Sequence, residues 1–209
     1  MMRIDSLAAQ PDRAGRHTVR FEDGSVLRLY RQTIQDFSLY SGLELSDDQF
    51  QQLKKAASAM SAKMRAVRIV SASSVSMGDL EQRLIRKGED PEQARKAVAW
   101  MAEMDLVDDE KTAHQVVDSC IRKGYGKARA KQALYEKRIP KEYWEAALAD
   151  YPDQEDSIME FLRARLRGSW EERDLRRAID ALIRRGHSYS QIRHALQEME
   201  LESELMEEE

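Results

Sequence analysis

The stretch Ser76-Met-Gly-Asp-Leu-Glu-Gln-Arg-Leu-Ile-Arg-Lys-Gly88 decides the fold, because its pattern returns twice further along the chain. Its Leu84 is matched by Leu134 and Leu182, which follow at intervals of 50 and 48 residues. A small or apolar residue stands four positions before each leucine, and apolar residues stand ten and fourteen positions after it. Such spacings place apolar side chains on one face of a helix, so each copy predicts two helices joined by a short break.

Each break contains residues that end one helix or begin the next. Gly88 and Gly186 suit the left-handed position that follows a helix, whereas the middle break, Lys137-Arg-Ile-Pro140, has no glycine there. Asp90 and Ser188 are good N-cap residues, and each precedes a glutamine by three positions. We therefore expect helix boundaries at all three breaks, with the middle boundary the least well defined.

A third helix is expected in the first two repeats, at about 109–123 and about 155–167. The predicted fold is mainly α, with tandem three-helix repeats in a curved, solenoid-like array. The expected divisions are an N-terminal extension (1–75), repeat 1 (76–125), repeat 2 (126–168), a truncated repeat 3 (169–200) and an acidic tail (201–209).

The N-terminal extension starts with a β pattern. The runs His17–Phe21 and Val26–Tyr30 flank Asp23-Gly24, which predicts a hairpin closed by a type I′ turn. Ser46-Asp-Asp-Gln49 forms a capping box in front of apolar residues at helical spacing. We expect a small β element over 16–45, packed on a helix over 46–70.

Composition excludes several classes of protein. The chain has 209 residues, with 34 basic and 38 acidic side chains and a single cysteine, Cys120, which excludes an internal disulfide framework or a zinc finger. No apolar run is long enough for a membrane span or a secretory segment. Motifs of serine hydrolases, phosphate-binding loops and zinc proteases are absent from the sequence. We expect a cytoplasmic, monomeric protein that is not an enzyme and holds no metal or cofactor.

Positive charge is concentrated in one segment. Residues 121–141 contain eight basic side chains and one acid, Glu136. An ordinary solvated helix face would mix both signs, so the imbalance favours an anionic partner, either nucleic-acid phosphates or an acidic protein surface. The candidate binding residues, called the basic stripe below, are Arg122, Lys123, Tyr125, Lys127, Arg129, Lys131, Lys137, Arg138 and Lys141.

A second basic set is diluted by acids, which favours a salt-bridged surface in water. Its members, kept as secondary candidates, are Arg163, Arg165, Arg167, Arg173, Arg176 and Arg177.

Several motifs have a familiar order and spacing. They are Ser76-x-x-Asp-Leu-x-x-x-Leu84-x-x-Lys-Gly88, Met104-Asp-Leu-Val-Asp-Asp109-x-x-x-Ala113, Lys123-Gly-Tyr-Gly-Lys-Ala128 with Leu134, and Leu182-x-x-Arg-Gly186-x-Ser-x-x-x-Ile192. Together they resemble the repeats of the RecX family of regulatory proteins, and the N-terminal hairpin is similar to the β extension of its longer members. Two positions depart from the family pattern: Thr112 replaces a usual aromatic residue, and Arg138 replaces a usual glycine.

The resemblance implies a non-enzymatic modulator of RecA, the recombinase that polymerises on single-stranded DNA. Such a protein would lie along the filament groove and restrain ATP hydrolysis and strand exchange, with some affinity for DNA. The residues themselves leave two alternatives open: a DNA- or RNA-binding helical-repeat module that acts without RecA, and a general scaffold for protein interactions.

Overall fold

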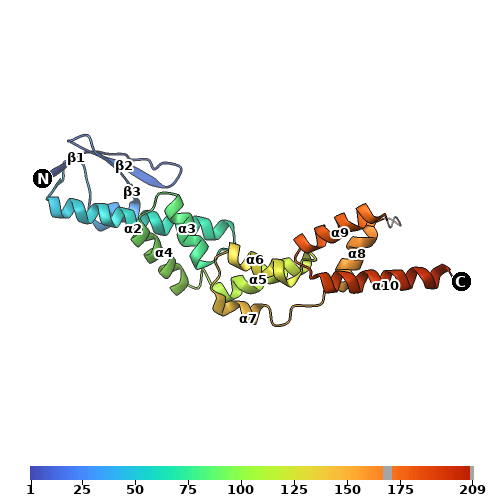
Figure 1. Ribbon diagram of the computed structural model, residues 1–209. Coiled ribbons are helices and arrows are strands. Elements are labelled where there is room, and N and C mark those ends of the chain that lie inside the picture. Colours follow the sequence, from blue (N-terminus) through green and yellow to red (C-terminus); the bar gives the residue numbers. More distant parts are fainter. Residues whose placement is uncertain (167–170, 208–209) are drawn as a thin grey trace. The chain divides into compact units, whose positions relative to one another are not determined.

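The computed structural model describes residues 1–166 and 171–207, with side chains described as far as residue 199. It is mainly helical, with a small N-terminal antiparallel sheet, as the sequence predicts (Figure 1). The chain divides into two compact units, Met1–Val107 and Asp108–Glu209. Within the described part of the chain, no helix has the length and apolar content needed to cross a membrane.

The first unit opens with a four-stranded sheet in the order β3-β2-β1-β4. Its strands are β1 (Met2–Leu7), β2 (Arg16–Phe21), β3 (Val26–Tyr30) and β4 (Glu44–Leu45). The predicted hairpin is confirmed, because β2 and β3 pair in antiparallel register. Arg16 lies opposite Tyr30 at one end of the ladder, and Arg20 lies opposite Val26 at the other. The expected β element was too narrow, since β1 also joins the sheet, and it missed a helical turn, α1 (Arg31–Asp36).

The hairpin turn differs from the predicted type I′ turn. Only Gly24 has a positive φ, 83°, whereas a type I′ turn needs a positive φ at both central residues. The amide of Gly24 donates to the Phe21 carbonyl, and the amide of Phe21 donates to the Ser25 carbonyl, both at 2.9 Å. These bonds close a three-residue loop in which glycine takes the left-handed position after a type I turn.

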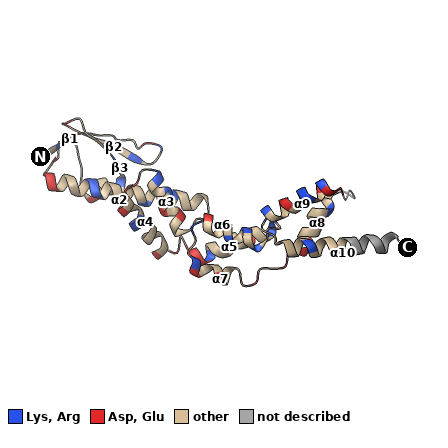
Figure 2. Cartoon of the chain, in the orientation of Figure 1, with Lys and Arg blue, Asp and Glu red and all other residues tan. Residues whose placement is uncertain are grey.

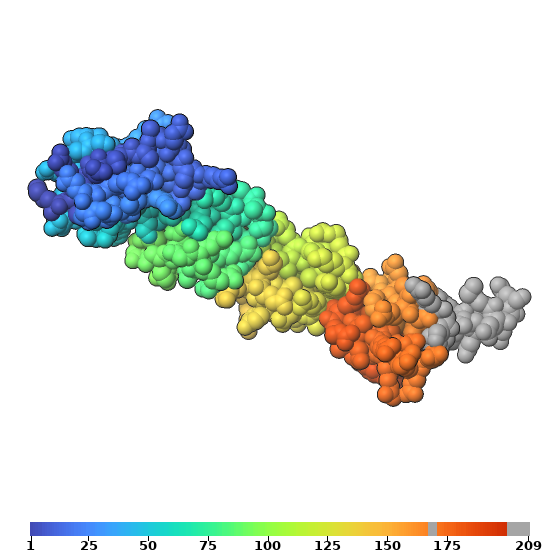
Figure 3. Space-filling view, turned by 90° about the horizontal axis from the view of Figure 1, so that it is seen from above, coloured from blue at the N-terminus to red at the C-terminus, as the bar shows by residue number. Residues whose placement is uncertain are grey.

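Helix α2 (Asp47–Ala72) is shared by two hydrophobic cores. The capping box is confirmed: Gln49 N donates to Ser46 Oγ at 3.2 Å, and Ser46 N donates to Gln49 Oε1 at 2.8 Å. Leu53, near the start of the helix, packs in the core of the sheet. The residues of the sheet (blue) and those of α2 (cyan) lie against each other in the first unit (Figure 3). Further along, Ala62, Ala66 and Ile69 pack with α3 (Met77–Arg86) and α4 (Pro91–Glu103).

The second unit contains two further cores. The first lies among α5 (Asp109–Arg122), α6 (Lys127–Glu136), the 3₁₀ turn η1 (Lys141–Tyr143) and α7 (Trp144–Ala147). The second lies among α8 (Glu155–Leu166), α9 (Glu172–Arg184) and α10 (Tyr189–Glu207). The repeat register is confirmed at its anchors, because Leu84, Leu134 and Leu182 are all 0 % exposed.

The cores group the helices one helix earlier than the expected divisions. Helix α5 was assigned to repeat 1 (76–125), but its Val117 and Cys120 pack with Leu134 of α6. Helix α8 was assigned to repeat 2 (126–168), but it shares a core with Leu182 of α9. The triplets are therefore α2–α4, α5–α7 and α8–α10, and the last triplet is not truncated. A periodic pattern gives the length of a repeat but not the helix with which each unit begins.

The second repeat departs from the expected helices in one further place. The helix expected around Trp144 and Leu148 is reduced to η1 and the single turn α7. Pro152 follows closely, and a proline disfavours helical geometry in the residue before it, here Tyr151.

Thr112, one of the two positions that depart from the family pattern, is buried in α5, and its hydroxyl donates to the Asp108 carbonyl at 2.7 Å. At the C-terminus, α10 continues to Glu207, and residues 208–209 of the predicted acidic tail lie outside the described residues.

Candidate partner-binding surface

The basic stripe follows the ends of two helices rather than one face of a single helix. Arg122 is the last residue of α5 and Lys123 its C-cap, whereas Lys127 begins α6. Lys137 is the C-cap of α6, and Lys141 begins η1. Most of the stripe is exposed to solvent, but Tyr125, Arg129 and Lys137 are half-buried.

One flank of α6 carries a row of side chains suited to a partner. Lys127, Lys131 and Tyr135 are spaced four residues apart, so they line up along the helix, while Ala130 and Leu134 face the core at 0 % exposure. Tyr135 is 67 % exposed. Neither lysine forms an ion pair with any residue that the structure describes. Lys127, Lys131 and Tyr135, called the α6 row below, therefore offer two unneutralised cations beside an accessible aromatic ring.

Arg129 does not belong to this row. It lies two residues after Lys127, which corresponds to about 200° around the helix. Its Nη1 pairs with Glu136 Oε1 at 3.1 Å, and Gln132 also donates to that carboxylate, at 3.2 Å. Hydrogen bonds from Gln132 and then Arg129 hold the pKa of Glu136 below its ordinary value. The charge of Arg129 is thus partly offset within α6.

Tyr125 joins the two helical triplets of the second unit. Its carbonyl accepts a hydrogen bond from the Tyr151 hydroxyl at 2.6 Å. Burial raises the pKa of Tyr151 to about 12, so this hydroxyl stays protonated and able to donate. The Arg185 guanidinium lies 5.9 Å from the centre of the Tyr125 ring and 4.6 Å from that of Phe161. Tyr125 therefore packs inside the unit, and the exposed aromatic residue of this segment is Tyr135, which was not among the predicted site residues.

A cleft lies at the C-terminal end of α6. It has a volume of about 450 Å³ and is lined by Tyr135, Glu136, Arg138, Ile139, Pro140, Lys141 and Trp144. Trp144 was not predicted as a site residue, and its Nε1 donates to the Ile139 carbonyl at 3.0 Å, which fixes the indole. Two cations, Arg138 and Lys141, and two aromatic rings, Tyr135 and Trp144, border this cleft. Proteins that bind single-stranded nucleic acids use the same combination of positive charge and aromatic rings.

Arg138 occupies a backbone position that normally belongs to glycine. Its φ is 55°, and the corresponding residues after α3 and α9, Gly88 and Gly186, have φ values of 86° and 89°. The left-handed conformation costs a residue with a side chain about 1–2 kcal/mol. Helix α6 still ends where a glycine would end it, since the amides of Arg138 and Ile139 donate to Tyr135 and Leu134. The arginine adds a cation to the cleft at the expense of backbone strain.

The secondary basic set is largely neutralised on α9. Arg176 pairs with Glu172 at 2.6 Å, while Arg177 and Arg173 lie 3.6 and 3.8 Å from the Asp174 carboxylate. Figure 2 shows the two signs alternating along this helix. On α8, Arg163 and Arg165 are exposed, and Arg167 lies outside the described residues. The arrangement on α9 is that of a salt-bridged surface in water.

The remaining candidate groups have structural roles. Cys120 is 5 % exposed inside the α5–α7 core, and burial raises the pKa of its thiol, so it packs there as the sequence predicts. Among the described residues, no three His, Cys, Asp or Glu side chains are arranged to hold a metal ion.

Comparison with protein families identifies one matching region. The family model for the second three-helix domain of RecX matches residues 108–148, which are the residues of the α5–α7 triplet. Two curated relatives cover most of the chain. The regulatory protein RecX of Vibrio parahaemolyticus serotype O3:K6 is 26 % identical over 146 residues, 68 % of this chain and 94 % of the relative. That of Streptococcus gordonii is 24 % identical over 192 residues, 90 % of this chain and 74 % of the relative.

Solved structures show the same fold. A crystal structure of a regulatory protein RecX superimposes with a TM-score of 0.65 at 20 % identity, covering 94 % of this chain and all of the other. The structure of RecX from Lactobacillus salivarius gives a TM-score of 0.59 at 20 % identity, covering 70 % of this chain and 99 % of the other.

Proposed function

This chain belongs to the RecX family of regulatory proteins, non-enzymatic regulators of RecA, and on that premise we propose that it binds the RecA filament on single-stranded DNA and inhibits it. In this proposal the protein acts as a monomer in the cytoplasm. By occupying the filament it slows ATP hydrolysis and strand exchange, with no chemical step of its own.

The observation that supports a particular surface for this role is the α6 row. Lys127 and Lys131 are exposed cations without ion pairs among the described residues, and Tyr135 is the exposed ring beside them. Cations of this kind attract either DNA phosphates or acidic side chains of RecA, and a neighbouring aromatic ring adds contact area with little conformational cost. The cleft bordered by Arg138 and Lys141 extends the same surface.

The test of the proposal is RecA ATPase activity on single-stranded DNA, measured while the protein is added from substoichiometric amounts to a large excess. The expected result is inhibition that already appears below one molecule per RecA subunit, because one bound molecule on a polymer affects several subunits. Unchanged RecA turnover at every ratio would contradict the proposal. A rise in turnover would keep RecA as the partner and reverse the direction of regulation.

A second candidate function is a nucleic-acid-binding module that acts without RecA. The feature in its favour is again the α6 row with the adjoining cleft, whose mixture of cations and rings is typical of surfaces for single-stranded nucleic acids. Tight binding to single-stranded DNA or RNA, together with unchanged RecA turnover, would favour this function over the first.

A further inference from the structure

A second cleft, in the first unit, is lined by cations from three separate elements. It lies between the hairpin, α2 and α3 and has a volume of about 400 Å³. Its lining residues with positive charge are Arg16, Arg65, Arg68, Arg83 and Lys87, and no acidic residue lines it. Because these residues are up to 71 positions apart, no single run of the sequence reveals them.

Helical spacing explains how the cleft is built. Arg65, Arg68 and Ile69 follow Ser61 at intervals of four, three and one residues, which places all of them on one face of α2. Arg83 and Lys87 are four residues apart at the end of α3, so they also face the same side. The hairpin closes the cleft with Arg16 and Tyr30.

Three of the cations are neutralised by carboxylates outside the lining. Arg16 pairs with Asp12 at 2.8 Å, and Arg83 pairs with Asp79 at 2.8 Å. Arg65 pairs at 2.6 Å with Glu89, whose side chain is only 6 % exposed. Each of these arginines therefore has its counter-ion already in place.

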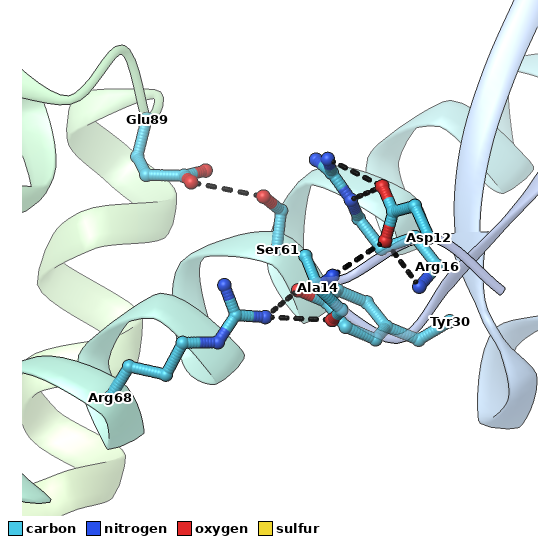
Figure 4. A network of polar contacts seen from close by, with 7 residues as sticks. All are labelled: Asp12, Ala14, Arg16, Tyr30, Ser61, Arg68 and Glu89. Carbon is cyan, nitrogen blue, oxygen red and sulfur yellow. Dashed lines mark hydrogen bonds and ion pairs between the residues drawn. The ribbon is translucent and has the colours of Figure 1, made fainter.

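Arg68 and Lys87 differ from these three, because their charges remain uncompensated. The Nη2 of Arg68 donates to the Ala14 carbonyl at 2.9 Å and to the Tyr30 hydroxyl at 2.7 Å, and both acceptors are uncharged (Figure 4). Its Nε and Nη1, like the Lys87 ammonium, have no partner among the residues that the structure describes. Two positive charges thus remain at this cleft on side chains that are exposed to solvent, where they can attract an anion.

The geometry of Arg68 also suits an anion of a particular shape. Its contacts with Ala14 and Tyr30 hold the guanidinium in place through one nitrogen, so binding through the other two costs less conformational entropy. A planar guanidinium with two free donors matches two oxygens of a phosphate. The hydroxyl group of Ser73 lines the same cleft and can donate to a further oxygen, whereas Ser61 already donates to Glu89 Oε1 at 2.9 Å.

We propose that this cleft is a phosphate-binding site, in which Arg68 and Lys87 hold the phosphate of a nucleic-acid backbone or of a free nucleotide. The proposal concerns the first unit alone and does not depend on RecA. It therefore stands or falls separately from the function proposed for the α6 row.

The test uses the full-length protein and follows the Arg68 Nε–Hε resonance by NMR at low salt. Pyrophosphate, ATP and a short oligo(dT) are added in separate titrations. The expected result is a saturable shift of this resonance in wild type and a loss of affinity of about tenfold or more in Lys87→Glu. A shift with oligo(dT) identifies the nucleic-acid backbone as the source of the phosphate. A shift with pyrophosphate and ATP alone identifies a free nucleotide.

The matched control is Lys55→Glu, which makes the same change of charge at an exposed position of α2 outside the cleft. We expect it to bind as wild type does, and urea unfolding checks that both variants retain the fold. No shift with any phosphate compound would overturn the proposal. So would equal losses in the two variants, or stronger binding of a poly-glutamate peptide, which would make an acidic protein segment the ligand.

Discussion

Gly126 and Gly186 meet backbone to backbone in the second unit. A Cβ atom on Gly126 would lie 2.0 Å from the Gly186 carbonyl oxygen, and one on Gly186 would lie 2.3 Å from the Arg129 amide nitrogen. The Gly126 amide donates to the Arg185 carbonyl at 2.9 Å across the same contact. The start of α6 and the end of α9 approach this closely because neither glycine has a side chain.

We expect Gly126→Ala to destabilise the second unit by about 1–3 kcal/mol, because backbone atoms cannot move aside for the added methyl group. The φ of Gly126 is −74°, so backbone strain makes no contribution. Urea unfolding measures the change. Gly24→Ala is the converse control, with a φ of 83° and no neighbour within 4 Å, and it should lose stability only through its backbone conformation. If Gly126→Ala were as stable as wild type, the start of α6 and the end of α9 could move apart without loss of stability, and the prediction would be wrong.

Arg138→Gly should raise the stability of the second unit by about 1 kcal/mol, because glycine takes a φ of 55° without the steric cost that arginine pays. The midpoint of urea unfolding checks this. Asp105→Gly is the comparison, since Asp105 has the same φ, 55°, but aspartate tolerates the left-handed region better, so a smaller gain is expected. If Arg138 serves the α6 surface, its replacement should also weaken RecA inhibition while stabilising the fold. A loss of stability would contradict the assignment of strain.

His187 should make the second unit less stable in mild acid. The residue is 4 % exposed, its Nε2 donates to the Gly124 carbonyl at 3.0 Å, and its buried Nδ1 has no partner among the described residues. Burial, and secondarily the charge of Arg185, lowers its pKa below the ordinary 6.5. The unfolded chain then binds more protons, so this contribution to stability is complete above about pH 6.5 and declines as the pH falls toward the folded pKa.

The measurement is the free energy of unfolding at about pH 7.5 and about pH 5.5. His187→Gln should reduce the loss on acidification. His194 acts in the opposite direction, because Glu155 raises its pKa and its contribution to stability therefore declines as the pH rises. To remove this effect, the protein with His187 and the variant His187→Gln should both carry His194→Gln. An equal loss in the two proteins would exclude His187 as the cause.

Leu134→Ala should cost about 2–5 kcal/mol, because the side chain is 0 % exposed in the α5–α7 core. Ile183→Ala provides a control in the same unit, since Ile183 is 48 % exposed and should lose less than about 1 kcal/mol. Thermal or urea unfolding measures both changes. Similar losses in the two variants would contradict the burial that defines the repeat.

Reversing two charges of the α6 row should weaken binding without unfolding the protein. The double variant Lys127→Glu/Lys131→Glu is expected to bind the RecA filament, or single-stranded DNA, at least about tenfold less tightly. If the partner is DNA, wild-type affinity should fall with salt by a logarithmic slope of about 0.7 per phosphate contact, and the variant should show a smaller slope. Arg28→Glu/Lys55→Glu changes the net charge equally at exposed positions of the first unit and should bind normally. Equal binding by both double variants would move the functional surface away from α6.

Local patterns in the sequence predicted the elements well. The Ser46 capping box, the Asp90 cap that accepts from Glu92 and Gln93, and the left-handed Gly88 and Gly186 all lie where the sequence indicates. Such features depend on neighbouring residues alone. The division into triplets was not predictable in the same way, because residues far apart in the sequence share each core and only tertiary packing shows which helices they belong to.

Sites were harder to predict than elements, for the same reason. The run of basic residues pointed to α6, but helix geometry separates Arg129 from Lys127 and Lys131. Packing leaves Tyr125 half-buried, whereas Tyr135 is exposed. The first-unit cleft could not be found at all, because its cations come from β2, α2 and α3.

Helix α2 makes the N-terminal sheet inseparable from the helices that follow it. At 26 residues it is about 39 Å long, and it is embedded in the sheet's core through Leu53 and in the α3–α4 core through Ala62 and Ala66. The sheet therefore resembles an appended module only in the sequence. Because α2 is one continuous helix, we expect a displacement of the sheet to move the α3–α4 core with it. A truncation that removed the strands would expose the apolar residues around Leu53 on α2. The first unit should accordingly respond as one mechanical element, with the cationic cleft lying along the C-terminal half of α2, beside the α3–α4 core.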